Sequence, residues 1–243
     1  MNDSIIDLVS EIKKAHRIVF FGGAGVSTSS GIPDFRSSSG LYHKEYGGVS
    51  AEEILSHHYF LKYPDRFYKF LKDKMLYLDA KPNYVHNFIA SMERDYNKDV
   101  AVITQNIDGL HQKAGSMHVV ELHGNILDYY CMGCGKEYDV SCLNTSVPTC
   151  SCGSMIRPQV VLYEEALDDE AISDAISSIK QADLMIVIGT SLVVQPAASL
   201  IRYFNGKCLV IVNQTKTDYD SLADIVIYDD LVSVFKKVGS NFL

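Results

Sequence analysis

Three polar side chains come directly after an apolar run that is typical of a buried strand. The run Val100–Ile103 is followed, after one threonine, by Gln105, Asn106 and Asp108. Ligands of open α/β sheets bind beyond the carboxyl ends of the strands, so these side chains are placed to meet a ligand. Turn formation explains one Asn or Asp comfortably, but three polar residues at one strand end favour a binding site.

A histidine ends the next apolar run in the same way. Val119–Leu122 is followed by His123 and then by glycine. By contrast, His86 falls inside an expected helix, and His57 and His58 fall in a segment without strand character, where structural roles are more common. We interpret His123 as a general base, since imidazole titrates near neutral pH.

Two later apolar runs also end in groups that suit a nucleotide. The run Leu184–Ile188 leads into Gly189-Thr190-Ser191, which offers backbone N–H groups and hydroxyls, and Val210–Val212 leads into Asn213. These groups suit contacts with ribose and adenine.

A glycine-rich segment follows the first apolar run of the chain. Ile18–Phe21 breaks into Gly22-Gly23-Ala24-Gly25, as expected where a strand turns into a phosphate-binding loop. The dinucleotide fingerprint G-x-G-x-x-G lacks its third glycine, and no isolated acid follows about 20 residues later. Instead Pro33-Asp34-Phe35-Arg36 follows almost at once, so the loop does more than hold a pyrophosphate.

Five of the six cysteines fall between positions 131 and 152. A pair with zinc-knuckle spacing is followed by a tighter second pair, which predicts one zinc ion held by Cys131, Cys134, Cys150 and Cys152. Cys142 stays open as a substitute ligand. Four thiolates favour a closed, structural site, because catalytic zinc keeps an open position. Cys208, alone in an apolar run, is expected to be a buried strand residue.

The bulk composition excludes two classes of partner. The 22 basic and 30 acidic residues give a formal charge of −8, which provides no diffuse attraction for nucleic acid or anionic lipid. The apolar runs are far shorter than the roughly 20 residues of a membrane span, and the first residues carry no basic segment typical of a signal peptide. We expect a soluble, cytoplasmic protein without nucleic-acid or membrane partners.

The apolar runs must belong to elements that position these residues. The runs described above, together with Val160–Tyr163, alternate with helical patterns such as Asp168–Lys180 and Pro196–Phe204. This predicts an α/β fold with a doubly wound, Rossmann-like parallel sheet. Two insertions break the rhythm and form a smaller domain: a helical insertion at 38–80 and a zinc-binding module at 126–157. The Rossmann-like domain comprises 1–37, 81–125 and 158–243.

These segments together resemble the sirtuin family of NAD-dependent protein deacylases, in its compact bacterial form. The resemblance covers about residues 15 to 235 and rests on seven segments in a fixed order: Gly23–Ser27, Gly31–Arg36, Thr104–Asp108, Glu121–Asn125, the cysteine module, Arg157-Pro158 and Gly189–Ser191. It implies transfer of an acyl group from lysine to ADP-ribose with release of nicotinamide. NAD is then a co-substrate, acylated proteins or peptides are partners, and the zinc is structural.

The resemblance also assigns roles to individual residues. It implies that Asn106 and Asp108 hold the nicotinamide carboxamide with Ile107 beside it, and that His123 deprotonates a ribose hydroxyl. Phe35 would cover the nicotinamide pocket, Arg36 would lie near the phosphates and ribose, and Gln105 would fix the ribose. The remaining cofactor contacts that it implies are those of Ala24, Thr28, Thr190, Ser191, Asn213 and Asp230.

This sequence departs from the family pattern at two places. Gly22 stands where the family usually has threonine. The peptide-pairing segment, which would use Val161 and Tyr163, has Tyr163-Glu164 in place of phenylalanine-glycine. A peptide would add there as an extra strand, held by backbone hydrogen bonds, and Glu164 favours basic neighbours in the peptide.

Three other activities fit parts of the same pattern. A mono-ADP-ribosyltransferase and an NAD hydrolase would use the same cofactor loop, although sirtuin-like transferases often lack the histidine that stands here at His123. An NAD-binding sensor would need neither a base nor a peptide-pairing strand. The products formed from NAD and an acetyl-lysine peptide separate all of these.

The acyl preference is predicted from the helical insertion. Relatives that favour succinyl or malonyl lysine carry a tyrosine and, three residues later, an arginine; here the matching positions are Tyr68 and Leu71. An unpaired carboxylate beside leucine costs several kcal/mol, whereas each buried methylene gains roughly 0.8 kcal/mol. We expect faster removal of acetyl and longer uncharged chains than of succinyl. Values of kcat/KM on peptides that differ only in the acyl group test this, and equal rates would refute it.

Overall fold

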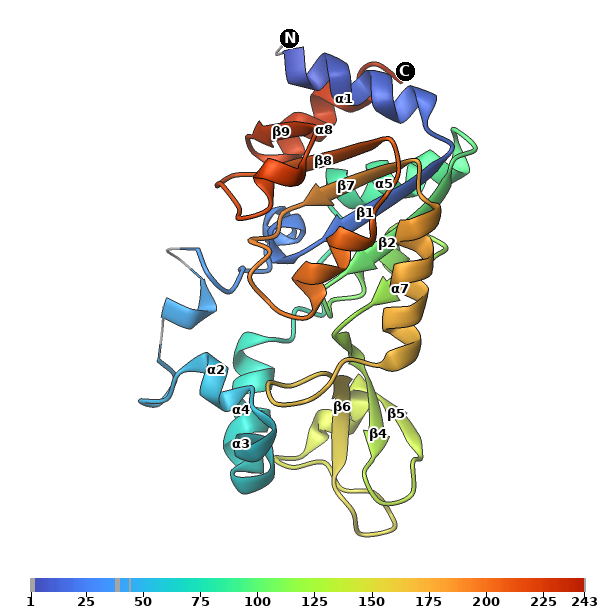
Figure 1. The fold of residues 1–243 in the computed structure, drawn as a ribbon. Helices are drawn as coiled ribbons and strands as arrows, with labels where there is room; N and C mark the ends of the chain where they lie inside the picture. The colour runs from blue at the N-terminus through green and yellow to red at the C-terminus, as the bar shows by residue number, and fades with distance from the viewer. Residues whose placement is uncertain (1–2, 38–39, 44, 243) are drawn as a thin grey trace.

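The computed structural model describes residues 3–37, 40–43 and 45–242. Its main sheet contains β1 Arg17–Gly22, β2 Asp99–Thr104, β3 Val119–Glu121, β7 Leu184–Ile188, β8 Cys208–Asn213 and β9 Ile225–Tyr228. The strands are parallel and lie in the order β3-β2-β1-β7-β8-β9 (Figure 1). β2 and β3 thus extend the sheet from one edge of β1, and β7, β8 and β9 extend it from the other edge of β1. The switch point between β1 and β7 is where such sheets bind ligands.

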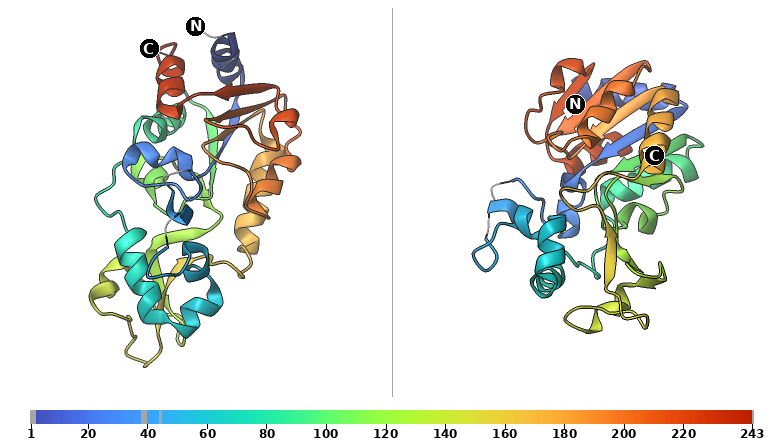
Figure 2. Two further views of the ribbon diagram at one scale, coloured as in Figure 1. Left: turned by 90° about the vertical axis from the view of Figure 1, so that its left-hand side faces the viewer. Right: turned by 60° about the horizontal axis from the view of Figure 1, so that its bottom comes forward.

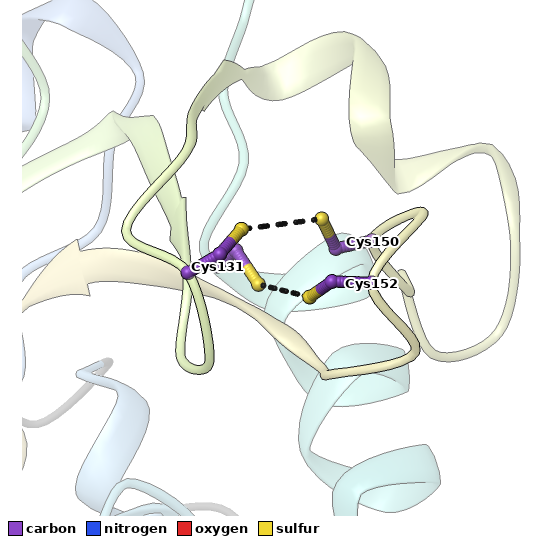
Figure 3. Close-up of side chains that lie close together, drawn as sticks. Cys131, Cys150 and Cys152 are labelled. Carbon is purple, nitrogen blue, oxygen red and sulfur yellow. Dashed lines mark hydrogen bonds between the residues drawn. The ribbon is translucent and has the colours of Figure 1, made fainter.

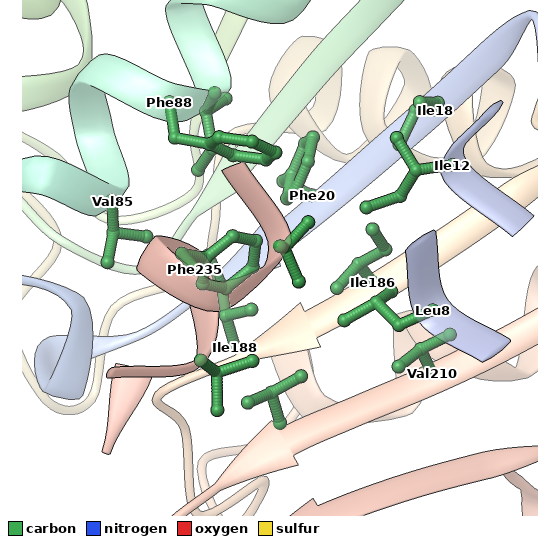
Figure 4. Packing of buried hydrophobic residues seen from close by; sticks show 14 of the residues in the cluster. Leu8, Ile12, Ile18, Phe20, Val85, Phe88, Ile186, Ile188, Val210 and Phe235 are labelled. Atoms are coloured by element: carbon green, nitrogen blue, oxygen red, sulfur yellow. The ribbon is translucent and has the colours of Figure 1, made fainter. Parts of the chain in front are cut away.

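Helices cover both faces of this sheet: α1 Asp3–Lys14, α5 Tyr84–Arg94 and α8 Leu231–Gly239 on one, and α7 Asp169–Gln181 with the 3-10 helix η5 Ala197–Tyr203 on the other. Alternate side chains of a strand point to opposite faces. Phe20 of β1 therefore packs with Phe88 and Phe235 in the first layer (Figure 4), whereas Phe21 packs in the second. This burial on both faces explains why the strands are continuously apolar.

The two insertions lie together beneath the main sheet (Figure 2). One contains α2 Ala51–Ile54, α3 His57–Lys62 and α4 Pro64–Lys74, and the other an antiparallel sheet of β4 Gly124–Cys131, β5 Glu137–Asp139 and β6 Ile156–Val160. They share one core, in which Phe60 and Phe67 pack with Ile126, Val160 and Leu162. The smaller layer is therefore a single packing unit built from two distant stretches of chain.

Short elements complete the chain: α6 Leu110–Ala114, η1 Ala24–Val26, η2 Thr28–Ser30, η3 Leu41–His43, η4 Val140–Asn144 and η6 Asp220–Leu222. Within the part of the chain that the structure describes, no helix combines the length and apolar character needed to cross a membrane.

The doubly wound sheet with a smaller insertion domain is confirmed, but one expected strand is wrong. Val160–Tyr163 is not a strand of the main sheet, because the strand here, β6, ends at Val160 and pairs with β4. Val160 and Leu162 are apolar because they enter the core of the smaller layer. Pro196–Phe204 forms a 3-10 helix, η5, and Cys208 is buried in β8 as expected.

Two histidines are buried side by side next to the end of β1. The rings of His86 on α5 and His111 on α6 have centroids 4.7 Å apart, and their exposed fractions are 0% and 1%. Burial disfavours the charged imidazolium and lowers the pKa of His86 to about 4 and that of His111 to about 3. Both side chains are therefore neutral in the folded protein near pH 7.

Mild acid should destabilise the fold through these two side chains. The pKa values of both side chains are depressed in the folded protein. The free energy of unfolding is therefore highest above the unfolded pKa of about 6.5 and falls as the pH drops below it, because the unfolded chain then binds protons that the folded chain does not. Between pH 7 and pH 5 each should cost on the order of 1–2 kcal/mol of unfolding free energy. Urea unfolding of the wild type and His111→Leu measures this, and the variant should show a weaker pH dependence. The exposed His16 provides the control as His16→Leu; an unchanged dependence in His111→Leu would contradict the assignment.

Candidate active site and metal centre

The glycine loop after β1 closes against the residue that follows β7. The Gly25 N–H donates to the Gly189 carbonyl over 2.8 Å, and the Gly23 N–H donates to the Ile188 carbonyl over 3.2 Å. A Cβ on Gly25 would lie 2.8 Å from the Gly189 Cα and carbonyl oxygen, and Gly189 itself has a φ of +56°. Both positions therefore require glycine. The contact places the two loops over the switch point of the sheet.

A chain of hydrogen bonds joins the glycine loop to the segment after β2. Asn106 Nδ2 donates to Ser27 Oγ over 3.1 Å, and Ser27 Oγ donates to Asp108 Oδ2 over 2.6 Å. The second carboxylate oxygen of Asp108 accepts the Leu110 N–H over 2.9 Å. Ser27 and Asn106 are 1% and 9% exposed, so the amide and the carboxylate are held in fixed positions. Sequence reasoning gave Ser27 no role; its place two residues after Gly25 was the available signal.

His123 follows β3, and its ring points back to the segment after β2. Its Nδ1 lies 2.9 Å from the Gln105 carbonyl oxygen. Since a carbonyl only accepts, Nδ1 carries the proton and Nε2 is the basic nitrogen. Burial lowers the pKa of His123, and the hydrogen bond to Gln105 partly offsets this effect. The imidazole ring is therefore neutral near pH 7.

The side chain of Gln105 connects the ends of two strands. Its Nε2 donates to the Thr190 hydroxyl over 3.1 Å, which links the residues after β2 with those after β7 across β1. Ile107, in the same segment, accepts the Ile126 N–H on its carbonyl over 2.9 Å. The segment after β2 is thus fixed both to the main sheet and to the smaller layer.

Phe35 and Arg36 lie in a loop that folds back on itself after the glycine loop. The Tyr42 N–H donates to the Phe35 carbonyl over 2.9 Å. The Tyr42 ring centroid is 5.2 Å from that of Phe35 and 5.2 Å from the Arg36 guanidinium carbon. Ala24 begins η1, and the Thr28 hydroxyl donates to the Gly25 carbonyl over 3.0 Å. These expected cofactor residues all belong to the β1 loop and its continuation.

The other expected nucleotide contacts follow β7, β8 and β9 at the same edge of the sheet. Ser191 is exposed next to Thr190. Asn213 Nδ2 donates to the Thr215 carbonyl over 2.9 Å, and Asp230 Oδ1 accepts the Ser233 N–H over 2.8 Å as the cap of α8. Asn213 and Asp230 are thus engaged locally, and their contacts with a nucleotide stay predictions.

The expected peptide edge lies just beyond β6. The Val161 N–H donates to the His123 carbonyl over 2.9 Å, which places this edge beside His123. The Tyr163 N–H and carbonyl pair with Leu55 and His57, each over 3.0 Å. Glu164 has a φ of +75°, in the region that glycine favours, and its carboxylate accepts from the His58 N–H over 3.1 Å.

The two residues assigned to the acyl group lie in a different environment from the one expected. Tyr68 and Leu71 are 0% and 1% exposed and belong to the shared core of the smaller layer. The Tyr68 hydroxyl donates to the Ile156 carbonyl of β6. In this structure the pair joins α4 to the antiparallel sheet, and its contact with an acyl chain stays a prediction.

Four cysteines meet at the far end of the antiparallel sheet, and Figure 3 labels Cys131, Cys150 and Cys152 of this group. The Sγ atoms of Cys131 and Cys152 are 3.4 Å apart, those of Cys134 and Cys150 are 3.7 Å apart, and all four lie within 4.8 Å of one another. A tetrahedral site with Zn–S bonds of about 2.3 Å has S···S edges of roughly 3.8 Å, so the donor set fits zinc. Cys142 is not a member of this group.

The position of this cluster favours a structural role. Cys131 ends β4, whereas His123 directly precedes its first residue. At about 3.3 Å per strand residue, the two ends of β4 are roughly 23 Å apart, too far for a metal to act on the same reacting atoms. The Tyr138 hydroxyl donates to Cys150 Sγ over 3.1 Å, a contact that favours the thiolate.

The doubly wound sheet, with hydrogen-bonded polar groups and a partly buried imidazole at its switch point, defines a nucleotide-binding enzyme whose smaller layer carries a cysteine cluster that fits zinc. The family model for the Sir2 family matches residues 23–196, so the chain belongs to this family.

The similarity to the relatives below covers nearly the whole chain. An NAD-dependent protein deacetylase of Clostridium acetobutylicum is 49% identical over 243 residues, which cover 96% of this chain and 99% of the relative. An NAD-dependent protein deacetylase of Staphylococcus aureus strain N315 is 47% identical over 241 residues, which cover 98% of this chain and 99% of the relative. A solved Sir2 structure with a p53 peptide and NAD+ has a TM-score of 0.86 at 39% identity, covering 97% of each chain. A structure of Sir2Tm bound to a propionylated peptide has a TM-score of 0.87 at 38% identity, and the match covers 100% of this chain and 99% of that chain.

Removing one thiolate should remove the zinc. Structural zinc contributes on the order of 10–16 kcal/mol of apparent binding energy in small modules, which is comparable to the stability of a whole domain. We expect one ion per chain in the wild type and in Cys142→Ser, and loss of the ion with unfolding of the antiparallel sheet in Cys152→Ser. Elemental analysis and circular dichroism measure both. Loss of zinc in Cys142→Ser alone would refute the ligand set.

Proposed function

We propose that this chain is an NAD-dependent protein lysine deacetylase that transfers the acyl group from lysine to ADP-ribose and releases nicotinamide. The observation that carries the proposal is the neutral His123, whose Nδ1 proton is fixed by the Gln105 carbonyl at 2.9 Å, next to the fixed Asn106–Ser27–Asp108 chain. The names of the relatives and the NAD and peptide ligands of the matching structures support it.

Asn106 and Asp108 orient the leaving group in this proposal. A carboxamide presents one acceptor and two donors, and an Asn amide together with an Asp carboxylate supplies the complementary groups. Ser27, which bonds to both side chains, keeps them from rotating. The two side chains are already oriented before the ligand binds, so no further entropy is lost in orienting them during the reaction.

His123 acts as the base on a ribose hydroxyl through Nε2. The Gln105 carbonyl holds the ring in the required tautomer and stabilises the imidazolium that forms, because Nδ1–H then donates to it more strongly. General-base catalysis of this kind is typically worth about 10²–10⁴-fold. Phe35 covers the reacting sugar and excludes water, which would otherwise hydrolyse it.

The acylated peptide adds as a strand beside Val161 and Tyr163, and backbone hydrogen bonds supply most of its affinity. We place 1–37, 81–125 and 158–243 in the cofactor-binding domain, and 38–80 with 126–157 in the smaller domain that frames the peptide. A cytoplasmic location is part of the proposal, since thiolate zinc sites are characteristic of reducing compartments.

Product analysis tests the proposal directly. The protein is mixed with NAD and an acetyl-lysine peptide, and products are identified by mass spectrometry. A deacetylase yields nicotinamide, free lysine and O-acetyl-ADP-ribose. ADP-ribosylated peptide would indicate a transferase, and ADP-ribose formed without peptide would indicate a hydrolase; either result without deacetylation would refute the proposal.

His123→Ala should abolish deacetylation while NAD binding persists. The base acts after both substrates are seated, so kcat should fall by at least about 10²-fold, and the Kd for NAD should change little. Steady-state rates and calorimetric titration measure the two effects. His118→Ala, which removes a surface imidazole bonded to Asp174, is the matched control. More than a tenth of wild-type turnover in His123→Ala would rule out this role.

A further inference from the structure

His58 lies between two carboxylates beside the expected peptide edge. Its Nδ1 is 2.8 Å from Glu164 Oε1, and its Nε2 is 2.9 Å from Glu53 Oε1. Its backbone N–H also donates to Glu164 Oε2 over 3.1 Å. Glu53 belongs to α2 and His58 to α3, whereas Glu164 directly follows Tyr163 beyond β6. Glu164 stands where the family usually has glycine, a residue with no carboxylate to offer.

This geometry requires a protonated imidazole. A carboxylate near neutral pH only accepts hydrogen bonds, so both ring nitrogens of His58 donate, and such a ring carries a positive charge. The hydrogen bonds to Glu164 and Glu53 therefore raise the pKa of His58, and the donors of His58 lower the pKa of Glu164. Because the pKa of His58 is raised, its charge is full below the ordinary value of about 6.5 and is lost as the pH rises through the raised value.

The neighbouring carboxylate, Glu165, is neutralised in a different way. It accepts from the Arg157 guanidinium over 2.8 and 2.9 Å, and His57 Nδ1 lies 2.7 Å from it. Arg157 keeps its proton at every pH at which the protein works, so the charge of Glu165 stays offset. Glu164 depends instead on an imidazole, whose charge changes near neutral pH.

The other groups around His58 do not replace its charge. Its Nδ1 also lies 3.1 Å from Ser56 Oγ, which is uncharged. Within the described part of the chain, the charges that act on His58 are those of Glu164 and Glu53. The further titratable side chains on the same three segments are those of Glu52, His57, Lys62 and Glu165. Of these, Lys62 has its Nζ 5.2 Å from the centre of the Tyr63 ring.

We propose that His58 sets the preference of this enzyme for basic peptide residues. When its ring is protonated it neutralises Glu164, and an arginine beside the acetyl-lysine gains little. When the ring is neutral, the Glu164 carboxylate is free to pair with that arginine. The two side chains are 51% and 50% exposed, so a peptide at this edge can reach both. The inference rests on the proposed function, which supplies the peptide.

The expected preference of Glu164 for basic neighbours therefore develops only as the pH rises. Fluorescence anisotropy without NAD measures peptide binding in the absence of turnover. Two labelled acetyl-lysine peptides are compared, with arginine at both flanking residues in one and its uncharged isostere citrulline in the other. The Kd of the citrulline peptide divided by that of the arginine peptide should be about two- to fivefold larger at pH 9 than at pH 6, the effect of one exposed ion pair.

Two variants identify the residues responsible. His58→Ala should show the larger ratio at both pH values, because Glu164 then has no imidazole beside it at either pH. Glu164→Gln should show the smaller ratio at both, because the carboxylate is gone. His118→Ala, which removes a surface imidazole bonded to Asp174, is the matched control and should keep the change of the wild type with pH.

Three binding results would each overturn the inference: a ratio that does not change with pH in the wild type, the wild-type ratio at pH 6 in His58→Ala, or an unaltered pH dependence in Glu164→Gln. Failure of the wild type to bind either peptide would overturn it as well. Binding in the expected pattern without formation of O-acetyl-ADP-ribose would instead refute the proposed function, so the two failures are distinguishable.

Discussion

The 2.8 Å contact between the Gly25 N–H and the Gly189 carbonyl is the constraint on which the site depends. It holds two loops from adjacent strands against each other at a separation that no side chain permits. Ser27, which follows Gly25, forms hydrogen bonds with Asn106 and Asp108 after β2. The Gln105 side chain forms a hydrogen bond with Thr190, which follows Gly189 after β7. The residues that follow β1, β2 and β7 therefore form a single rigid rim. Rigidity of this kind is what electrostatic catalysis requires, because the groups need no reorganisation when charge develops.

His123 lies where the two layers of the molecule meet. It follows β3 of the main sheet and precedes β4 of the antiparallel sheet, so its backbone belongs to the junction. Its ring is fixed by Gln105 and its carbonyl by Val161. The orientation of His123 is thus set jointly by the segment after β2 and the segment after β6.

The sequence revealed those elements whose burial leaves a local pattern. Continuous apolar runs marked five of the six parallel strands, and the cysteine spacing predicted the four cysteines that the structure brings together, with Cys142 left open. Strand β9, Ile225–Tyr228, was missed because it is short and ends in a tyrosine that is 54% exposed. The resemblance to a known family, rather than periodicity, supplied the roles of Phe35 and Arg36. The Ser27 bridge and the burial of Tyr68 depend on how distant segments pack, which no local sequence window contains.

The shared core of the smaller layer has a consequence for synthesis of the chain. Its helical half, with Phe60 and Phe67, leaves the ribosome well before β6 supplies Val160 and the following Leu162. During that interval these aromatic side chains have no permanent partner, and transiently exposed apolar surface of this kind favours aggregation and chaperone binding. Closing the core also requires contacts of high sequence separation, which slow folding. The core of the smaller layer can therefore be completed only after β6 has been synthesised.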